Sequence, residues 1–161
     1  ILTAKQLALK DMTNSVYGNV GYIRSRLYVY DVASSITAYG RDTITKTKSM
    51  VEEKFRTKVL YSDTDSSLLK SLYDDLEKSH ALGTEISNFV TGSTKGLELQ
   101  FEKIFKTFLI IAKKRYAGWS FELTPRGWED RIEMKGIETV RRDWCSLTSE
   151  TMREVIEIIL K

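Results

Sequence analysis

The sequence predicts an α+β domain whose strands form an antiparallel sheet. Apolar residues recur at helical spacing in residues 4–17, 31–55 and 73–90, whereas residues 97–123 mix alternation with a short apolar run. The resulting order of helices and strands is typical of an α+β domain. The chain has 161 residues, 42% of them hydrophobic, which suits one domain with a core or a piece of a larger one.

The first half of the chain is predicted to hold two helices. Residues 4–17 form the first helix, which should stop at Gly18. The following "GNVGYIRSRLYVY" favours a turn and extended or irregular chain. A long helix is expected over 31–55, because Asp31 is suited to N-capping. Since "ILTAKQLALK" resembles a helix interior, we expect a fragment, or a subunit cut inside a larger fold.

A hairpin, a helix, further strands and a closing helix complete the prediction. The hairpin is "KVLYSDTDSSLLK" (58–70), and the helix at 73–90 should end at the breaker "TGSTKG". Strands are expected over 97–123 and in "WEDRIEMKG", separated by a turn at "TPRG". Ser146 or Ser149 is expected to cap the last helix, 150–160, whose apolar residues share one face.

The charge distribution predicts a polyanionic partner. The net charge is only +3, but a basic stripe occupies the segment from Glu102 to Gly118, which contains one acid. Such a stripe fits a polyanion, with a solvated face as the alternative. Its five cations are Lys103, Lys106, Lys113, Lys114 and Arg115.

The single cysteine and the single histidine limit the chemistry. Cys145 cannot form an intrachain disulfide, which favours a reducing, intracellular compartment, and we expect it to be a small buried residue. His80, expected to be exposed, is the only histidine, which argues against histidine-ligated zinc and catalytic triads. There is no P-loop pattern, no apolar run of about 18 residues and no signal-peptide pattern, so no membrane association is expected.

Two aspartates stand one residue apart in the predicted hairpin. Asp63 and Asp65 would repel each other unless a cation lies between them. Mg²⁺ prefers oxygen ligands and is usually bound through one or two carboxylates plus substrate phosphates. An EF-hand loop fits poorly, because Leu68 and Asp74 stand where that loop needs glycine and glutamate. The alternative to a magnesium site is a solvated surface turn.

A polar stripe lies along the first predicted helix. Lys10, Asn14 and Tyr17 stand at i, i+4 and i+7, so they share one face. A lysine, an amide and a phenol in a row could bind a phosphorylated ligand that carries a ring. We expect the neighbouring Leu9, Met12, Thr13 and Val16 to be buried. Taken alone, the stripe is also compatible with an ordinary solvated helix face.

An apolar strand ends in a cluster of cations. In "IIAKKRYAG", Lys113, Lys114 and Arg115 precede Tyr116, and Gly118 permits close backbone approach. Lysine and arginine at a strand end can neutralise the phosphates of a nucleic-acid backbone. A basic patch of this kind has low specificity by itself.

Together these motifs resemble the family B (α-like, replicative) DNA polymerases, most closely the archaeal enzymes. "LALKDMTNSVYGNVGY" is similar to motif B of the fingers helix, and "VLYSDTDSS" to motif C of the palm. "KKRYAG" resembles the family's duplex-contacting K-K-x-Y motif, and "KGIETVRRDW" its palm-to-thumb junction. The four motifs follow one another in the family's order over nearly the whole chain.

The resemblance implies a domain organisation. Residues 1–17 would be the C-terminal part of the fingers helix, residues 18–140 part of the palm with its antiparallel sheet, and residues 141–161 the start of the thumb. The implied activity is DNA-directed DNA polymerisation, in which dNTPs are added to a primer 3′ end by two-metal phosphoryl transfer.

The resemblance also implies roles for single residues. Asp65 would be the principal metal ligand, with Asp63 in support, and Lys10 would add a cation at the leaving group. The residues implied to contact the incoming dNTP are Lys10, Asn14, Tyr17 and Gly18. Those implied to contact DNA are Lys113, Lys114 and Tyr116, with Arg141 and Arg142 further upstream on the duplex.

The implied cofactors and partners follow from the same resemblance. The cofactor is a pair of Mg²⁺ ions, with Mn²⁺ as a substitute. The partners are primer–template DNA, dNTPs and a larger polymerase part with motif A, exonuclease and N-terminal domains, together with a sliding clamp bound through regions outside this sequence. The expected location is intracellular, in the cytoplasm or nucleoid if the source is archaeal.

One part of the family pattern is missing. No D-x-x-S-L-Y-P-type motif A, which supplies the other metal-binding carboxylate, occurs in this sequence. We therefore expect the chain to be active only when joined to a part that bears motif A. The alternatives are a non-catalytic polymerase-like subunit that binds duplex DNA or serves assembly, and a generic basic DNA-binding module.

Overall fold

The computed structural model describes residues 2–139 and 144–161. This part of the chain contains four helices and five strands, and the strands form two antiparallel sheets. The predicted α+β class is therefore confirmed. The chain divides into two compact units, one made of Ile1–Lys54 and Val59–Leu68, the other of Phe55–Lys58 and Leu69–Lys161. None of the described helices combines the length and the hydrophobicity of a membrane span.

The first unit begins with helix α1, Leu2–Gly21. The predicted stop at Gly18 is wrong, because the helix continues for another turn beyond it. Gly18 lacks the positive φ angle of a helix-terminating glycine. The Asn19 side-chain amide also donates to the Ser15 carbonyl at 3.0 Å, which supports the added turn. The irregular segment predicted from residue 18 therefore occupies only residues 22–29.

Helix α2 and a hairpin follow. Helix α2 spans Tyr30–Phe55, close to the predicted range. The expected N-cap role of Asp31 is wrong, because the helix already begins at Tyr30 and Asp31 lies inside its first turn. Strands β1, Val59–Asp63, and β2, Ser66–Leu69, form the predicted hairpin and are joined by a tight turn. The Glu52 carboxylate accepts a hydrogen bond of 3.0 Å from the backbone N–H of Val59, which ties the end of α2 to the start of β1.

Helix α3, Leu76–Ser93, belongs to the second unit and differs from the prediction at both ends. It starts later because the Asp75 carboxylate caps it, accepting from the Lys78 N–H at 3.0 Å. It runs through the first residues of the predicted breaker "TGSTKG". Thr91 stabilises this end, since its hydroxyl bonds both the N–H (2.9 Å) and the carbonyl (3.3 Å) of Leu99.

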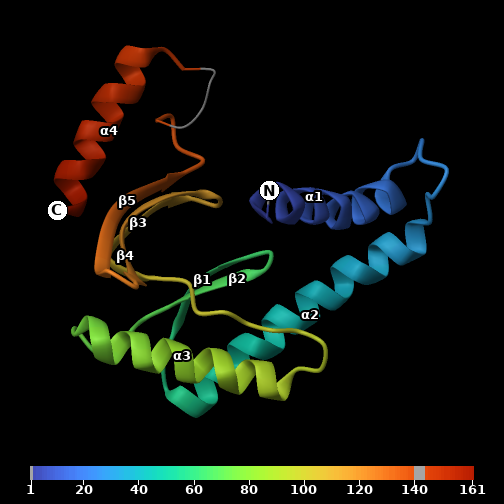
Figure 1. Cartoon of the computed structure of the whole chain (residues 1–161), viewed down its shortest axis with the longest axis horizontal. Helices are drawn as coiled ribbons and strands as arrows, with labels where there is room; N and C mark the ends of the chain where they lie inside the picture. The colour runs from blue at the N-terminus through green and yellow to red at the C-terminus, as the bar shows by residue number, and fades with distance from the viewer. Residues whose placement is uncertain (1, 140–143) are drawn as a thin grey trace. The chain divides into compact units, whose positions relative to one another are not determined.

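The main sheet has the order β3-β4-β5, with strands Ile104–Ala112, Arg115–Thr124 and Gly127–Lys135. The predicted turn at "TPRG" joins β4 to β5, where Thr124 pairs with Gly127. Helix α4, Ser146–Leu160, packs on one face of this sheet, as the red ribbon beside the orange strands in Figure 1 shows. The Thr107 hydroxyl anchors the last turn of α4 by donating to the Leu160 carbonyl at 2.6 Å.

A hydrophobic core cluster of the second unit lies between the sheet and α4. Ala117, Ile137, Ile156 and Leu160 are its buried residues, with Met134 and others packed against them. The predicted helix start at residue 150 is wrong, because α4 begins at Ser146 with Cys145 at the N-cap. Neither Ser146 nor Ser149 is therefore the cap residue, and Cys145 itself makes no side-chain capping bond.

Candidate functional site

The acidic pair lies at the tip of the hairpin in the first unit. Asp63 ends β1, and Thr64 and Asp65 form the turn. The Asp65 N–H donates to the Asp63 carbonyl at 2.7 Å, and the Ser66 hydroxyl donates to the same carbonyl at 3.2 Å. Asp63 is half-buried, whereas Asp65 is exposed. The turn therefore holds both aspartates on one short, locally hydrogen-bonded segment.

Thr64, between the two aspartates, has an unusual backbone conformation. Its φ angle is 56°, in the left-handed region that disfavours a β-branched residue. That conformation costs about 1–2 kcal/mol for a residue with a Cβ atom. The Thr64 hydroxyl donates to Asp63 Oδ1 at 3.1 Å, so the strained residue also orients one carboxylate. Strain of this kind clusters at functional sites, where the surroundings enforce it.

The donor chemistry of this turn fits a divalent cation only in part. Carboxylate oxygens are the ligands that Mg²⁺ prefers. Within residues 2–139 and 144–161, however, no group of three or more acidic, histidine or cysteine side chains could hold a metal ion. The two aspartates can thus supply only part of the oxygen ligands that Mg²⁺ takes.

The polar stripe lies on α1, in the same unit. Lys10, Asn14 and Tyr17 are all exposed. The apolar side chains beside them are exposed too, with 68% of Met12 and 63% of Val16 accessible, so the expected burial of this side is wrong. The reason is that α2 reaches only part of it, and an open apolar groove of about 350 Å³ remains. The groove is lined by Leu9, Met12, Thr13, Val16, Tyr17 and Ile36.

Tyr17 belongs to both the polar stripe and the groove. Its position gives one helix face a flat aromatic surface next to a lysine and an amide. A Cβ atom built at the neighbouring Gly18 would meet nothing within 4 Å, so the space beside it is open. This face of α1 can thus accommodate a ligand that has both a ring and a charged group.

The basic cluster lies in the second unit, at the turn between β3 and β4. Lys113 and Lys114 form that turn, and both are exposed. Lys114 has a φ angle of 63°, again left-handed for a residue that is not glycine. Tyr116 is half-buried on β4, with its ring 5.1 Å from that of Phe108. The predicted contacts Arg141 and Arg142 lie outside the described residues.

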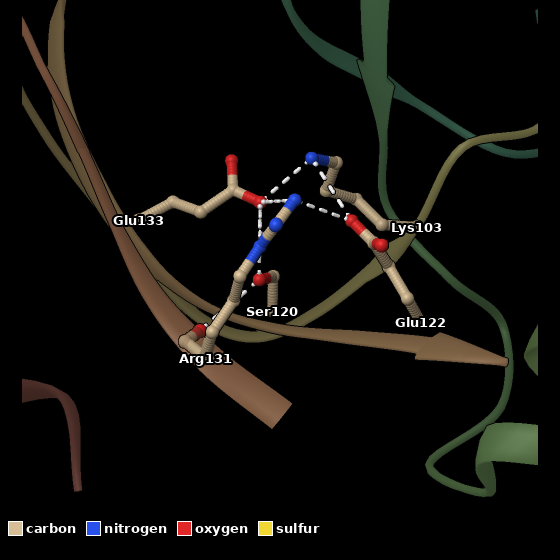
Figure 2. Close-up of polar contacts among 5 residues, drawn as sticks. All are labelled: Lys103, Ser120, Glu122, Arg131 and Glu133. Carbon is tan, nitrogen blue, oxygen red and sulfur yellow. Dashed lines mark hydrogen bonds and ion pairs between the residues drawn. The ribbon is translucent and has the colours of Figure 1, made fainter. Parts of the chain in front are cut away.

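A charged cluster on the sheet was not predicted from the sequence (Figure 2). Lys103 Nζ lies 2.6 Å from Glu133 Oε1 and 3.3 Å from Glu122 Oε1. Arg131 Nη2 lies 2.9 Å from Glu133 Oε1 and 2.6 Å from Glu122 Oε1. The buried Ser120 hydroxyl is 3.2 Å from Glu133 Oε1 as well. The cluster depends on the β4–β5 register, in which Ser120 pairs with Arg131, so the spacing of charges along the chain did not reveal it.

The environment of the cluster shifts three pKa values. The pKa of Arg131 is raised by its hydrogen bond and charge interaction with Glu133 and by the charge of Glu122. Burial by itself would raise the pKa of Glu133, but the hydrogen bonds and charges of Lys103 and then Arg131 outweigh it, so the pKa is lowered. Burial by itself would lower the pKa of Lys103, but Glu133 and Glu122 outweigh it, so the pKa is raised. All three shifts favour the charged forms, and the cluster therefore acts as a cross-link between β4, β5 and Lys103, the residue just before β3.

Two further expectations are corrected. His80 is half-buried rather than exposed, because its ring packs edge-on against Phe101 (5.1 Å between centroids) and Trp128 (5.8 Å). Cys145 is exposed rather than buried. Its Sγ lies 3.1 Å from the Thr148 hydroxyl, and this bond lowers the thiol pKa.

Comparison with known proteins identifies the family. The family model described as "DNA polymerase family B" matches residues 1–161. This chain belongs to DNA polymerase family B. The resemblance carried by "KDMTNSVYG", "YSDTDSS" and "KKRYAG" is thereby confirmed at the level of the family.

The family B relatives include catalytic subunits of replicative polymerases. The DNA polymerase delta catalytic subunit of Candida albicans is 42% identical over 172 residues, covering 100% of this chain and 16% of that protein. The DNA polymerase delta catalytic subunit of Arabidopsis thaliana is 40% identical over 171 residues, covering 99% of this chain and 15% of that protein. The DNA polymerase alpha catalytic subunit of Xenopus laevis is 38% identical over 157 residues, covering 97% of this chain and 11% of that protein. This chain thus spans about one sixth of the length of the first of these relatives.

Proposed function

We propose that this chain is part of the catalytic region of a DNA-directed DNA polymerase, which adds dNTPs to the 3′ end of a primer. The observation that carries the proposal is the family match over the whole chain, together with relatives that are polymerase catalytic subunits. The aspartate turn, the polar stripe and the basic turn supply the residue types that phosphoryl transfer on nucleic acid needs. The remaining parts of the polymerase, among them the part that carries motif A, complete the site.

The proposed division into domains follows the motifs. Residues 1–17 form the end of the fingers helix, residues 18–140 belong to the palm, and residues 141–161 begin the thumb. The three-stranded sheet is suited to a palm, because its strands carry charged side chains on a rigid layer. Helix α1 extends past the first proposed boundary to Gly21, so that the fingers and palm segments share one helix end.

Asp65 and Asp63 are the proposed ligands of two Mg²⁺ ions, for which Mn²⁺ can substitute, and Asp65 is the principal one. When bound, such ions neutralise the triphosphate and activate the primer 3′-hydroxyl. The locally hydrogen-bonded turn at Thr64 supports this role, because it limits the positions of both carboxylates before any ligand binds. The third carboxylate comes from motif A, outside this chain.

The α1 stripe is the proposed dNTP contact. Lys10 and Asn14 bind the triphosphate, and Lys10 also neutralises charge on the leaving pyrophosphate. Tyr17 lies against the nascent base pair, and Gly18 keeps the approach open. Exposure of all three stripe side chains and the open space at Gly18 support this assignment.

The basic turn is the proposed contact with primer–template DNA. Lys113 and Lys114 neutralise backbone phosphates, Tyr116 supports them from β4, and Arg141 and Arg142 contact the duplex further upstream. A larger polymerase part and a sliding clamp are the proposed protein partners. The proposed location is inside the cell, with the DNA that is copied.

Asp65→Asn in the complete polymerase tests this function. The substitution keeps the size of the side chain and removes a ligand charge, and we expect nucleotide incorporation with Mg²⁺ to fall roughly a thousandfold, since metal-ion charge stabilisation contributes several kcal/mol to the barrier. Primer–template affinity should change little. Asp74→Asn, an exposed aspartate outside the turn, is the matched control and should incorporate normally.

Two outcomes would contradict the proposal. Equal incorporation by the Asp65 and Asp74 variants would remove Asp65 from the chemistry. DNA binding without synthesis by the unmodified polymerase, unchanged by either substitution, would support the non-catalytic subunit instead.

A further inference from the structure

The basic turn at residues 113–114 is in close backbone contact with the segment that follows β5. Gly136 has a φ angle of 65°, in the left-handed region. A Cβ atom at Gly136 would overlap the carbonyl oxygen of Lys114 and lie 3.4 Å from Cγ of Arg115. Only glycine allows this close approach. Lys114, the residue approached, itself has a φ angle of 63°, in the left-handed region.

An ion pair joins the same two segments. The Arg115 guanidinium donates from Nη2 to Oε1 of Glu138. The Arg115 side chain is 38% exposed and that of Glu138 only 13%, so the pair is shielded from solvent more than an ordinary surface pair. The basic turn is thus joined to residues 136–138 by a steric contact and by a charge contact.

Residues 136–138 are themselves anchored in the core. Ile137, between Gly136 and Glu138, is fully buried beside Ala117 and Ile156. The Ser149 hydroxyl of α4 donates to the Glu138 carbonyl at 3.1 Å. The contacts to the basic turn therefore come from a segment that is held by both the sheet and α4.

We propose that Gly136 and Glu138 are positioning residues that hold the turn of Lys113 and Lys114 in its DNA-binding conformation. The inference rests on the proposed function, in which these lysines contact the primer–template backbone. Two flexible lysines on a free loop would lose conformational entropy on binding, whereas a turn fixed in advance loses less.

Glu138→Gln in the complete polymerase is the first test, because the loss of a negative charge and the loss of the ion pair predict opposite changes in DNA affinity. Removing a negative charge near the turn should by itself strengthen binding to DNA. Loss of the ion pair should instead weaken binding to a primer–template duplex roughly three- to tenfold. It should also make the plot of log K against log salt less steep, by about 0.9 for each phosphate that the turn no longer neutralises. Glu154→Gln, an exposed residue of α4 with the same charge change, is the control.

Gly136→Ala is the second test and leaves every charge in place. We expect a similar decrease in affinity and in salt dependence, because the added methyl group displaces the Lys114 carbonyl. Gly92→Ala on α3 is its control, since a Cβ atom there meets nothing within 4 Å. Affinity is measured by fluorescence anisotropy at a temperature well below the unfolding midpoint of each variant. If one of the two positioning variants unfolds, the affinity of the other one tests the proposal.

The double variant Lys113→Ala/Lys114→Ala separates this inference from the function on which it rests. If it binds DNA as the unmodified polymerase does, the proposed DNA contact is wrong. If it binds weakly while Glu138→Gln and Gly136→Ala behave like their controls, only the positioning role is wrong. Unfolding of both positioning variants would also overturn that role, because it would show that these residues serve the fold itself.

Discussion

At the scale of single residues, backbone strain coincides with the proposed functional turns. Among the described residues, the positive φ angles outside glycine belong to Arg56, Thr64 and Lys114. Thr64 lies between the two aspartates, and Lys114 lies in the basic turn. A glycine would relieve the strain at either position, so the side chains present there are retained against a local energetic cost.

Thr64→Gly separates fold stability from function. Relief of the left-handed strain and the larger entropy of the unfolded glycine chain oppose each other, so the free energy of unfolding should change by less than about 1 kcal/mol. Nucleotide incorporation by the complete polymerase should fall about tenfold, because the aspartates lose the constraint between them. Urea unfolding and a primer-extension assay measure the two effects. Arg56→Gly, at a φ angle of 52°, is the matched control and should leave incorporation unchanged; an equal loss in both variants would contradict the argument.

At the scale of elements, the charged cluster of Lys103, Glu122, Arg131 and Glu133 cross-links the sheet. Lys103 lies just before β3, Glu122 on β4, and Arg131 and Glu133 on β5. The lowered pKa of Glu133 means that its stabilising effect is present above its ordinary pKa of 4.5 and is lost as pH falls through the lower folded value. The raised pKa of Lys103 means that its effect is present below 10.5 and is lost as pH rises through the higher folded value.

Glu133→Gln should therefore destabilise the sheet unit in a pH-dependent way. Between pH 4.5 and pH 10.5 we expect a loss of about 1–3 kcal/mol in the free energy of unfolding, since Lys103 and Arg131 lose a charged hydrogen-bond partner. The difference in the free energy of unfolding between this variant and the unmodified chain should shrink below pH 4.5. Chemical denaturation over a pH series gives this measurement, with the exposed Glu129→Gln as control. A difference that stays constant into the acid range would show that charge is not the cause.

At the scale of the whole molecule, the two units differ in how much apolar surface they bury. The second unit has a core in which Ala117 and Ile137 are fully buried. In the first unit no described side chain of α1 is buried, and those of α2 that are buried are Ala33 and Val51. Isolated helices are marginal in water, because most helix stability in proteins comes from packing. The first unit should therefore be the less stable part of this chain.

Hydrogen exchange on the 161-residue chain tests this difference. Amides of α1 should exchange close to their unprotected rates, whereas those of β4 should exchange only at the rate of global unfolding. Ile137→Ala should cost about 2–4 kcal/mol through the cavity it leaves, and it should lower protection in β4 but not in α1. Equal protection of α1 and β4, or an equal loss in both, would show that the chain unfolds as one cooperative unit.

The sequence by itself determined the α+β class, the hairpin and the family. These features depend on local periodicity and on short motifs such as "YSDTDSS", which are readable because each involves residues close together in the chain. Helix α2 was predicted within one residue for the same reason, since its apolar residues recur at loosely helical spacing from Val32 to Val51. The acidic pair, the polar stripe and the basic turn were also located in this way, and their roles remain proposals.

Only the tertiary structure decided where contacts between distant segments form. The charged cluster depends on strand register, and the contact of Gly136 and Glu138 with the basic turn joins residues more than one strand apart. The burial of His80 depends on Phe101 and Trp128, which no local pattern connects to it. The predicted helix ends at Gly18 and Glu150 were wrong, because residue preference alone does not fix where a helix ends: α1 continues past Gly18 without a positive φ angle there, and α4 begins after Cys145, which makes no side-chain capping bond. Such contacts are pairings between parts of the chain far apart in sequence, and periodicity carries no information about them.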